Sequence, residues 1–267
     1  MKKILILLSL FILILTIFGC SEKGTEELVV GMELAYPPFE TKDENGDPAG
    51  VSVDFAEAFG EFLGRPVKIE NINWDGLIPA LQTGKVDMVI SSMTINESRL
   101  EKIDFSKPYA KALLALLVNS GSEIQSAEDL DQEGMIIAAK TGSTGHIYAE
   151  KNLTNAEILS LPDESACVTE VVQGKADAFI YDQLTIYRNN KMNPDTTKAI
   201  YIPFQDVEYW GVGVKKGNTE LLEKLNDFID KFYEEGGFDE ITQKHLKEEK
   251  EAFDRYNFEW FFTDVNK

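Results

Sequence analysis

From residue 28 onward, short apolar runs alternate with longer stretches in which apolar residues recur at helical spacing. The short runs are typical of buried strands, and the first three cover residues 27–33, 66–72 and 86–92. The stretches between them predict helices over residues 53–64 and 76–84, and Gly84 is expected to end the second helix. Strands that alternate with helices indicate a largely parallel sheet with crossover connections.

The same pattern returns in the second half of the chain. Further strands are predicted over residues 113–119, 134–140, 157–161 and 176–182, and helices over residues 126–130, 146–152 and 164–174. Each half has a helix that ends in Gly-Lys-x-Asp, at residues 84–87 and 174–177. We therefore expect two similar α/β lobes.

The C-terminal region differs from both halves. Residues 219–246 predict two amphipathic helices broken at Gly236-Gly237, and with no strand of their own these helices must pack onto a lobe already formed. The last segment is too apolar for a free tail because of Phe258, Trp260, Phe261 and Phe262, and we expect these residues to dock on the protein.

The chain begins with an export pattern. Lys2 and Lys3 precede an almost unbroken apolar run over residues 4–18, which is short for a membrane span and typical of a secretory signal peptide. Ile-Phe-Gly-Cys at residues 17–20 resembles a bacterial lipobox, so we expect a lipoprotein signal peptide over 1–19, palmitate on Cys20 and a lipidated tether over 20–27. Lipidated Cys20 would anchor the protein to the outer face of the cell membrane. The alternative is an uncleaved anchor helix, which also exports the protein.

Charge and cysteine content exclude several classes of function. The formal net charge is −20, and removal of residues 1–19 leaves 24 basic residues against 46 acidic ones, a charge of −22. Such acidity excludes a general nucleic-acid role and disfavours adhesion to anionic lipid surfaces. Once Cys20 is lipidated, Cys167 has no cysteine with which to form an intrachain disulfide. His146 and His245 lack a second histidine or cysteine at ligand spacing, so neither a metal nor another cofactor is expected.

Polar side chains gather where the predicted strands end. In open α/β sheets ligands bind at the carboxyl ends of strands, often at helix N-termini. The side chains at such positions are Glu33 and Tyr36 at or beyond the end of the first strand; Ser91, Ser92, Thr94 and Arg99 at or beyond the end of the third; Lys140, Ser143 and Thr144 in the Gly-rich stretch 140–145; and Tyr181 and Asp182 at the end of the strand over 176–182.

These residue types suit one kind of ligand. The Arg99 guanidinium can pair with a carboxylate through two hydrogen bonds, and the hydroxyls of Thr94 and Thr144 can complete that cradle. Asp182 follows an apolar strand and can pair with an ammonium group, although it can also cap the next helix. A carboxylate clamp with an ammonium acceptor recognises an α-amino acid. Lys140 either reaches the ligand or lies at the rim of the cleft. Asp54 is expected to cap the helix over 53–64 or to place a negative charge in its first turn, and we favour the cap.

At these residues the chain resembles the family 3 solute-binding proteins of bacterial ABC importers, which bind polar amino acids. The similar motifs occur in the family's order over most of the mature chain, from about residue 28 to 247. They are YPPFE (36–40), VDF (53–55), WDGLIPALQTGKVD (74–87), SSMTINESRLEKIDFSKPY (91–109), KTGST (140–144) and GKADAFIYD (174–182).

The resemblance implies an α/β fold of the type II periplasmic-binding-protein-like class, a two-lobed clamshell in which helices flank a mixed sheet in each lobe. Lobe 1 would comprise residues 28–112 and the return helices over 207–250, and lobe 2 residues 113–206. The hinge would consist of crossings near residues 110–116 and 203–210. Residues 251–267 would form a C-terminal tail, which departs from the family.

The resemblance also implies roles for individual residues. Arg99 and Thr94 look like the carboxylate site of lobe 1, Thr144 like the contact from lobe 2, and Asp182 like the amino-group acceptor. Tyr36 and Trp74 look like two aromatic walls around the ligand side chain. The full predicted ligand-binding set is Glu33, Tyr36, Trp74, Ser91, Ser92, Thr94, Arg99, Lys140, Ser143, Thr144, Tyr181 and Asp182.

The side chain of the ligand is less closely specified. Glu33 beside Tyr36 and Trp74 would suit a guanidinium held between aromatic faces, which favours a basic, arginine-like ligand. Glutamine is the alternative, because Ser52 stands where lysine- and arginine-binding relatives often have an acid, and Tyr181 could donate to an amide.

The function implied is capture of an amino acid by lobe closure and its delivery to an ABC permease and its ATPase, by a protein expected to be a monomer. A ligand-sensing protein and an enzyme resembling cyclohexadienyl dehydratase are alternatives on the same fold. Glu33 is the one acid–base candidate in the sequence, and because nothing there activates it we expect no enzyme.

Overall fold

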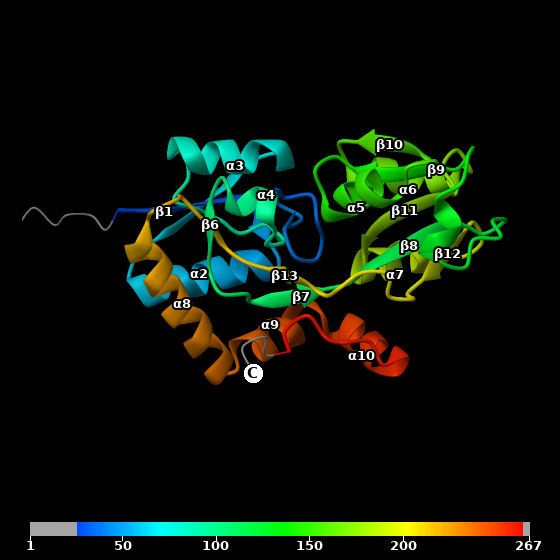
Figure 1. The fold of residues 1–267 in the computed structure, drawn as a ribbon. Coiled ribbons are helices and arrows are strands. Elements are labelled where there is room, and N and C mark those ends of the chain that lie inside the picture. The colour runs from blue at the N-terminus through cyan, green and yellow to red at the C-terminus, as the bar shows by residue number, and fades with distance from the viewer. Residues whose placement is uncertain (1–25, 264–267) are drawn as a thin grey trace, which may run out of the picture.

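The structure, a computed structural model, describes residues 26–263 and shows two α/β lobes side by side (Figure 1). The predicted two-lobed α/β fold is confirmed. The predicted signal peptide, Cys20 and most of the tether lie outside the described residues. Within residues 26–263, no helix combines the length and the apolar character that a membrane crossing requires.

Lobe 1 is built on a mixed five-stranded sheet of order β4-β1-β5-β14-β6. Its strands are β1 (Leu28–Met32), β4 (Val67–Asn71), β5 (Met88–Val89), β6 (Asp104–Phe105) and β14 (Gly213–Val214). Strand β1 is parallel to β4 and β5, whereas β14 is antiparallel to β5 and β6. Around the sheet lie a short hairpin and five helices: β2 (Thr41–Lys42), β3 (Pro48–Ala49), α2 (Val51–Leu63), α3 (Trp74–Thr83), α4 (Glu97–Leu100), α8 (Thr219–Glu234) and α9 (Gly237–His245).

Lobe 2 has its own mixed five-stranded sheet, of order β10-β9-β11-β8-β12. Strand β9 is parallel to β10 and β11, and β8 is antiparallel to β11 and β12. Its elements are β8 (Leu114–Asn119), η1 (Ala127–Leu130), β9 (Ile136–Lys140), α5 (Thr144–Asn152), β10 (Glu157–Leu161), α6 (Glu164–Val172), β11 (Ala178–Asp182), α7 (Gln183–Met192) and β12 (Thr197–Ile200).

A two-stranded antiparallel ribbon joins the lobes (Figure 1). It consists of β7 (Ala110–Ala112), which leads into lobe 2, and β13 (Glu208–Trp210), which returns to lobe 1. Its register places Glu208 opposite Ala112 and Trp210 opposite Ala110. The two crossings therefore lie side by side, as a hinge between rigid bodies requires.

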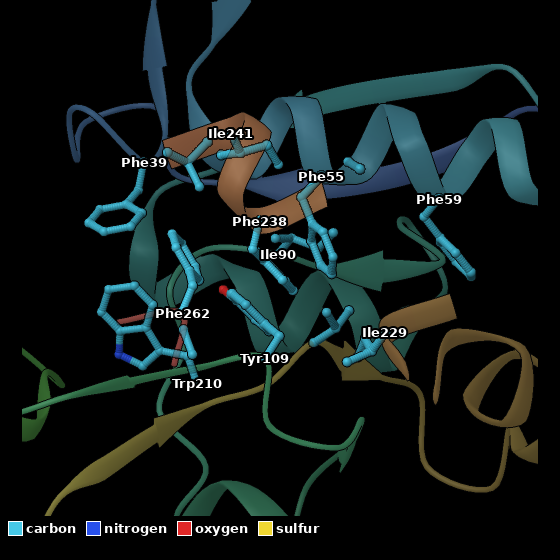
Figure 2. Close-up of a cluster of buried hydrophobic side chains, with 14 of the residues drawn as sticks. Phe39, Phe55, Phe59, Ile90, Tyr109, Trp210, Ile229, Phe238, Ile241 and Phe262 are labelled. Atoms are coloured by element: carbon cyan, nitrogen blue, oxygen red, sulfur yellow. The ribbon is translucent and has the colours of Figure 1, made fainter. Parts of the chain in front are cut away.

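The predicted C-terminal helices form and cover lobe 1. Helix α8 ends at Glu234 and α9 begins at Gly237, so the predicted break at Gly236-Gly237 is confirmed. Figure 2 shows how Phe238 of α9 enters the aromatic core beside Phe55 of α2, with ring centroids 5.3 Å apart. Burial of such large rings stabilises the attachment of the return helices.

Helix ends follow the local sequence at one predicted position and depart from it at another. Gly84 adopts the left-handed conformation with φ 77° and ends α3 as predicted. The predicted capping role of Asp54 is wrong, because α2 begins at Val51 with Gly50 as its N-cap residue. The Asp54 carboxylate instead contacts two side chains of α9, Lys244 at 2.6 Å and His245 at 2.8 Å.

The aromatic tail docks on the protein, as predicted. It follows a helix that was not predicted from the sequence, α10 (Lys247–Tyr256). The rings of Trp260, Phe261 and Phe262 are buried, and Phe261 lies 5.3 Å from Trp210 of the ribbon. Its carbonyl accepts a hydrogen bond of 3.0 Å from the Lys111 backbone of β7.

The same segment also reaches lobe 2. The Phe258 ring lies 4.7 Å from that of Tyr201, which follows β12, and the Tyr256 ring lies 6.4 Å from that of Tyr187 on α7. The tail therefore packs on both lobes and on the ribbon that joins them.

We expect the Phe261→Ala substitution to lower the free energy of unfolding by roughly 3–5 kcal/mol, because it leaves a large cavity in a well-packed core. Thermal and urea unfolding would measure this loss. The matched control is Tyr256→Ala, since that ring is 58 % exposed and its removal leaves no buried cavity. A loss for Phe261→Ala as small as that expected for the exposed Tyr256 would show that the tail is only loosely attached.

A buried acid lies beneath the cleft face of lobe 1. Glu40 is 0 % exposed, and its carboxylate accepts hydrogen bonds from the hydroxyls of Ser52 and Ser92. Burial disfavours the charged form and raises the pKa of Glu40 to about 8 from 4.5, although both serine hydroxyls oppose the change.

This shift makes stability depend on pH. A folded-state pKa above the unfolded value contributes stability that is complete below about pH 4.5 and is lost as pH rises through about 8. We expect Glu40→Gln, which cannot ionise, to show a smaller fall in melting temperature between pH 5 and pH 9 than the parent protein. Parallel melting curves for the two proteins across this range would contradict the assignment.

Candidate ligand-binding site

A hollow of about 490 Å³, counted to its open mouth, lies between the lobes. The structure brings eleven of the twelve predicted ligand-binding residues to this one cavity. Lobe 1 supplies Glu33, Tyr36, Trp74, Ser91, Ser92, Thr94 and Arg99, and lobe 2 supplies Ser143, Thr144, Tyr181 and Asp182. Lys140, the twelfth, is not among the lining residues but pairs with one of them, Glu33.

Arg99 is the buried cation of the cleft. It lies in the short helix α4, where the Asn96 side chain accepts a 3.0 Å hydrogen bond from its backbone N–H. Its guanidinium is 6 % exposed and donates to the Thr94 carbonyl at 2.6 Å and, across the cleft, to the Gly142 carbonyl at 3.1 Å. Both of these acceptors are neutral backbone carbonyls, so neither of them cancels the positive charge.

Burial lowers the pKa of Arg99 to about 10, against the opposing effect of the Glu208 carboxylate. The guanidinium therefore remains charged at neutral pH. Its carbon atom lies 5.1 Å from the ring centroid of Trp74, a cation–π geometry that keeps the charged group near the cleft.

The two serines after β5 form hydrogen bonds within lobe 1. The Ser91 hydroxyl accepts a 3.0 Å hydrogen bond from the Glu33 backbone N–H and so fixes the end of β1. Ser92 has a positive φ of 46°, uncommon for a residue other than glycine, and its hydroxyl donates to Glu40 at 2.9 Å. Both residues line the cavity, but their hydroxyls have partners within the lobe.

Lobe 2 presents the N-terminus of α5 to the cleft. The Ser143 hydroxyl is the N-cap and accepts from the His146 backbone at 3.1 Å. The next residue, Thr144, donates its hydroxyl proton to Glu208 at 2.8 Å. A helix N-terminus with a hydroxyl donor suits an anionic group.

Asp182 ends β11 and serves two purposes at once. One carboxylate oxygen caps α7 by accepting from the backbones of Leu184 at 2.9 Å and Thr185 at 3.1 Å. The other oxygen accepts from the Tyr36 hydroxyl of lobe 1 at 2.6 Å. Burial raises the pKa of Asp182 and these hydrogen bonds oppose that rise. The alternative of a capping role thus coexists with a position facing the cleft.

Glu33 and Lys140 form a buried ion pair across the cleft. The second oxygen of Glu33 accepts from the Trp74 backbone N–H at 3.2 Å, at the N-terminus of α3. The Lys140 ammonium also lies 5.5 Å from the centroid of the Trp74 ring. The Trp74 ring is therefore approached by two cations of the protein, Lys140 and Arg99.

Tyr36 and Trp74, the predicted pair of aromatic walls, both line the cavity, and each has further neighbours. Tyr36 lies edge-on to Tyr181 at 5.9 Å and to Trp210 at 6.3 Å. One aromatic group therefore gathers around the Tyr36–Asp182 contact, while Trp74 lies with the cations. Trp210 also lines the cavity, although it was not among the predicted ligand-binding residues.

Glu208 of β13 also lines the cavity, and it is the most important site residue that the sequence-based prediction missed. Its carboxylate accepts from the hydroxyls of Thr94 at 3.1 Å and Thr144 at 2.8 Å, and from the Gln205 amide at 2.6 Å. Burial raises the pKa of Glu208, and these donors oppose the rise. The sequence offered no local signal for it, since Glu208 lies 114 positions after Thr94. Leu114 at the start of β8 also lines the cavity.

The described part of the chain contains no cluster of side chains that could hold a metal ion. Among residues 26–263, no three histidine, cysteine, aspartate or glutamate side chains converge as metal ligands would. His146 accepts from the Gly142 backbone at 3.3 Å, and His245 contacts Asp54.

Comparison with known proteins agrees with this architecture. The chain is 30 % identical to the L-arginine-binding protein of Pseudomonas aeruginosa, covering 96 % of this chain and 99 % of that protein. It is 31 % identical to the ABC transporter glutamine-binding protein GlnH of Bacillus subtilis, covering 93 % and 99 %.

A solved structure, an ancestral arginine-binding protein bound to glutamine, is similar with a TM-score of 0.75 and 37 % identity, covering 82 % of this chain and 97 % of that one. The family model for bacterial extracellular solute-binding proteins, family 3, matches residues 28–248. This segment holds both sheets, the ribbon and every residue of the cleft. The chain therefore belongs to the bacterial extracellular solute-binding proteins, family 3.

Proposed function

We propose that this protein captures a polar L-amino acid between its lobes and delivers it to an ABC permease driven by an ATPase. The observation that carries the proposal is the placement of Arg99 on lobe 1 and Asp182 on lobe 2, both buried and facing one cavity. A guanidinium suits the ligand's carboxylate and a carboxylate suits its ammonium group. Closure engages both ends of the zwitterion, so the ligand favours the closed form.

The hinge ribbon and the contacts across the cleft support capture by closure. Tyr36 with Asp182, Glu33 with Lys140, and Arg99 with the Gly142 carbonyl each join the two lobes. These contacts are polar, so water and ligand groups can replace them when the lobes separate. An amino acid that exchanges hydrogen bonds with the same groups then shifts the population toward closure.

For the side chain of the ligand, the pairing of Glu33 with Lys140 favours an amide. The sequence favoured arginine because Glu33 appeared available to a guanidinium, but a lysine of lobe 2 already neutralises this acid. A lysine donor beside a carboxylate acceptor complements a carboxamide, which both donates and accepts. We therefore place glutamine first.

Arginine is the second candidate, supported by the excess of acid in the cleft. Among the described side chains around the cavity, Glu33, Asp182 and Glu208 outnumber the bases Arg99 and Lys140. A ligand with a net positive charge would balance this set.

The remaining parts of the proposal come from the sequence. Signal peptide cleavage and lipidation at Cys20 would anchor the protein outside the cell membrane as a monomer. We propose no enzymatic activity, because Glu33, the acid–base candidate, is held by Lys140 and the Trp74 backbone rather than poised over a reacting group.

Two conservative substitutions test the clamp. Arg99→Lys keeps a positive charge but loses the planar fork, and Asp182→Asn keeps an oxygen to cap α7 but loses the negative charge. We expect each to weaken binding of the preferred amino acid by about 100-fold or more in calorimetry, with little change in melting temperature. Arg65→Lys, at a partly exposed arginine of lobe 1 that does not line the cavity, is the control. Near-parent affinity in either cleft variant would refute the clamp.

The Glu33–Lys140 pair yields a test of ligand choice. Titration of the twenty amino acids, ornithine and citrulline should give tightest binding with glutamine. Lys140→Met removes the cation, so glutamine should bind about 10-fold more weakly and arginine more tightly. Lys151→Met, on the exposed side of α5, is the matched control. Tighter glutamine binding in the Lys140 variant would exclude the assigned role.

A further inference from the structure

The hinge ribbon places a carboxylate within the predicted carboxylate cradle. Glu208 is the first residue of β13, and one of its oxygens accepts from the hydroxyls of both Thr94 and Thr144. These hydroxyls come from opposite lobes. The Glu208 carboxylate also interacts favourably with the Arg99 guanidinium. Two hydroxyl donors and a guanidinium are the set assigned above to the carboxylate of an amino acid.

The cradle cannot serve two carboxylates at once. A threonine hydroxyl has one proton to donate, and Thr94 and Thr144 both direct theirs to Glu208. Two carboxylates on one guanidinium would also repel each other in a partly buried site, where charges are weakly screened. An arriving ligand carboxylate therefore requires the Glu208 side chain to leave or to lose its charge.

The Glu208 side chain borders a second hollow, into which its carboxylate could turn. Besides lining the cleft, it lines a wider neighbouring hollow together with Ile147, Tyr148 and Gln205. The Gln205 amide, which already donates to its second oxygen at 2.6 Å, lies in that hollow. A change of side-chain rotamer, with the ribbon backbone unchanged, would turn the carboxylate from one hollow toward the other.

We propose that Glu208 is an internal competitor for the ligand's carboxylate and thereby sets both the affinity and the ligand class of the cleft. The inference rests on the proposed function. With Glu208 in the cradle, the cleft holds the acids Glu208, Asp182 and Glu33, a set that accepts an amine without a carboxylate. With Glu208 turned away, Arg99 and the two threonines accept an α-amino acid.

Matched ligand pairs test this competition. Each pair is an amino acid and the same molecule without its carboxylate: glutamine with 4-aminobutanamide, and arginine with agmatine. Glu208→Gln removes the competing charge at nearly constant shape. We expect it to tighten binding of the preferred amino acid by about 10-fold or more, the scale of a hydrogen bond to a charged group, and to leave the matching amine bound equally or more weakly.

A second variant and a control complete the test. Glu208→Asp keeps the charge but shortens the side chain, so it should also favour the amino acid, by a smaller factor. Glu259→Gln removes the same charge from the tail segment that contacts β7 at Lys111, away from the cleft, and should change neither ligand's affinity. Melting curves verify that each variant is folded.

The outcomes separate the two proposals. A parent protein that binds an amino acid, with a Glu208→Gln variant that binds it equally or more weakly, overturns the inference and leaves the proposed function intact. An equal gain for the amino acid and its amine also overturns it, since that indicates a general change in the cleft. If neither protein binds any amino acid, both proposals fall.

Discussion

A buried guanidinium governs the arrangement of the cleft. Removing the charge of Arg99 from water is costly unless acceptors surround it, and the structure meets this requirement from three directions. The Thr94 carbonyl of lobe 1 and the Gly142 carbonyl of lobe 2 accept its protons, and the Trp74 ring lies beside it. Because these groups come from both lobes, the position of one arginine is coupled to the relative position of the two bodies.

The ribbon of β7 and β13 makes that coupling possible, because it joins the two lobes. The C-terminal segment packs against this ribbon. Figure 1 shows α9 and α10 on the side of the ribbon away from α3 and β10. Phe261 packs on Trp210 of the ribbon, while Phe258 lies against Tyr201 of lobe 2. The aromatic residues 258–262 lie beyond the residues that match the family model, which ends at residue 248. Aromatic packing from this last stretch therefore covers the ribbon that joins the lobes.

Agreement between sequence and structure was closest where the signal was local and periodic. The strand predicted over 176–182 appeared as β11 with the same last residue, and the ends of α3 and α8 follow the predicted glycines, because apolar period and glycine act over a few residues. Asp54 failed because Gly50 starts α2 earlier than the apolar pattern suggested, and a partner from α9 was available. Helix α10 was missed, since its strongly charged sequence has a narrow apolar face, at Ala252 and Phe253, and the Phe253 ring packs on the tail rings of Trp260 and Phe261.

The sequence by itself determined the order of elements, the two lobes and the residue types that meet between them. The tertiary structure decided which charge pairs with which. Glu33 has a lysine 107 positions away as its partner, and Glu208 has threonines from both lobes. The physical reason is that an ion pair depends on a distance of a few ångströms across the cleft, and that distance is set by how two separately folded sheets meet at a hinge. No local pattern of apolar and polar residues encodes it.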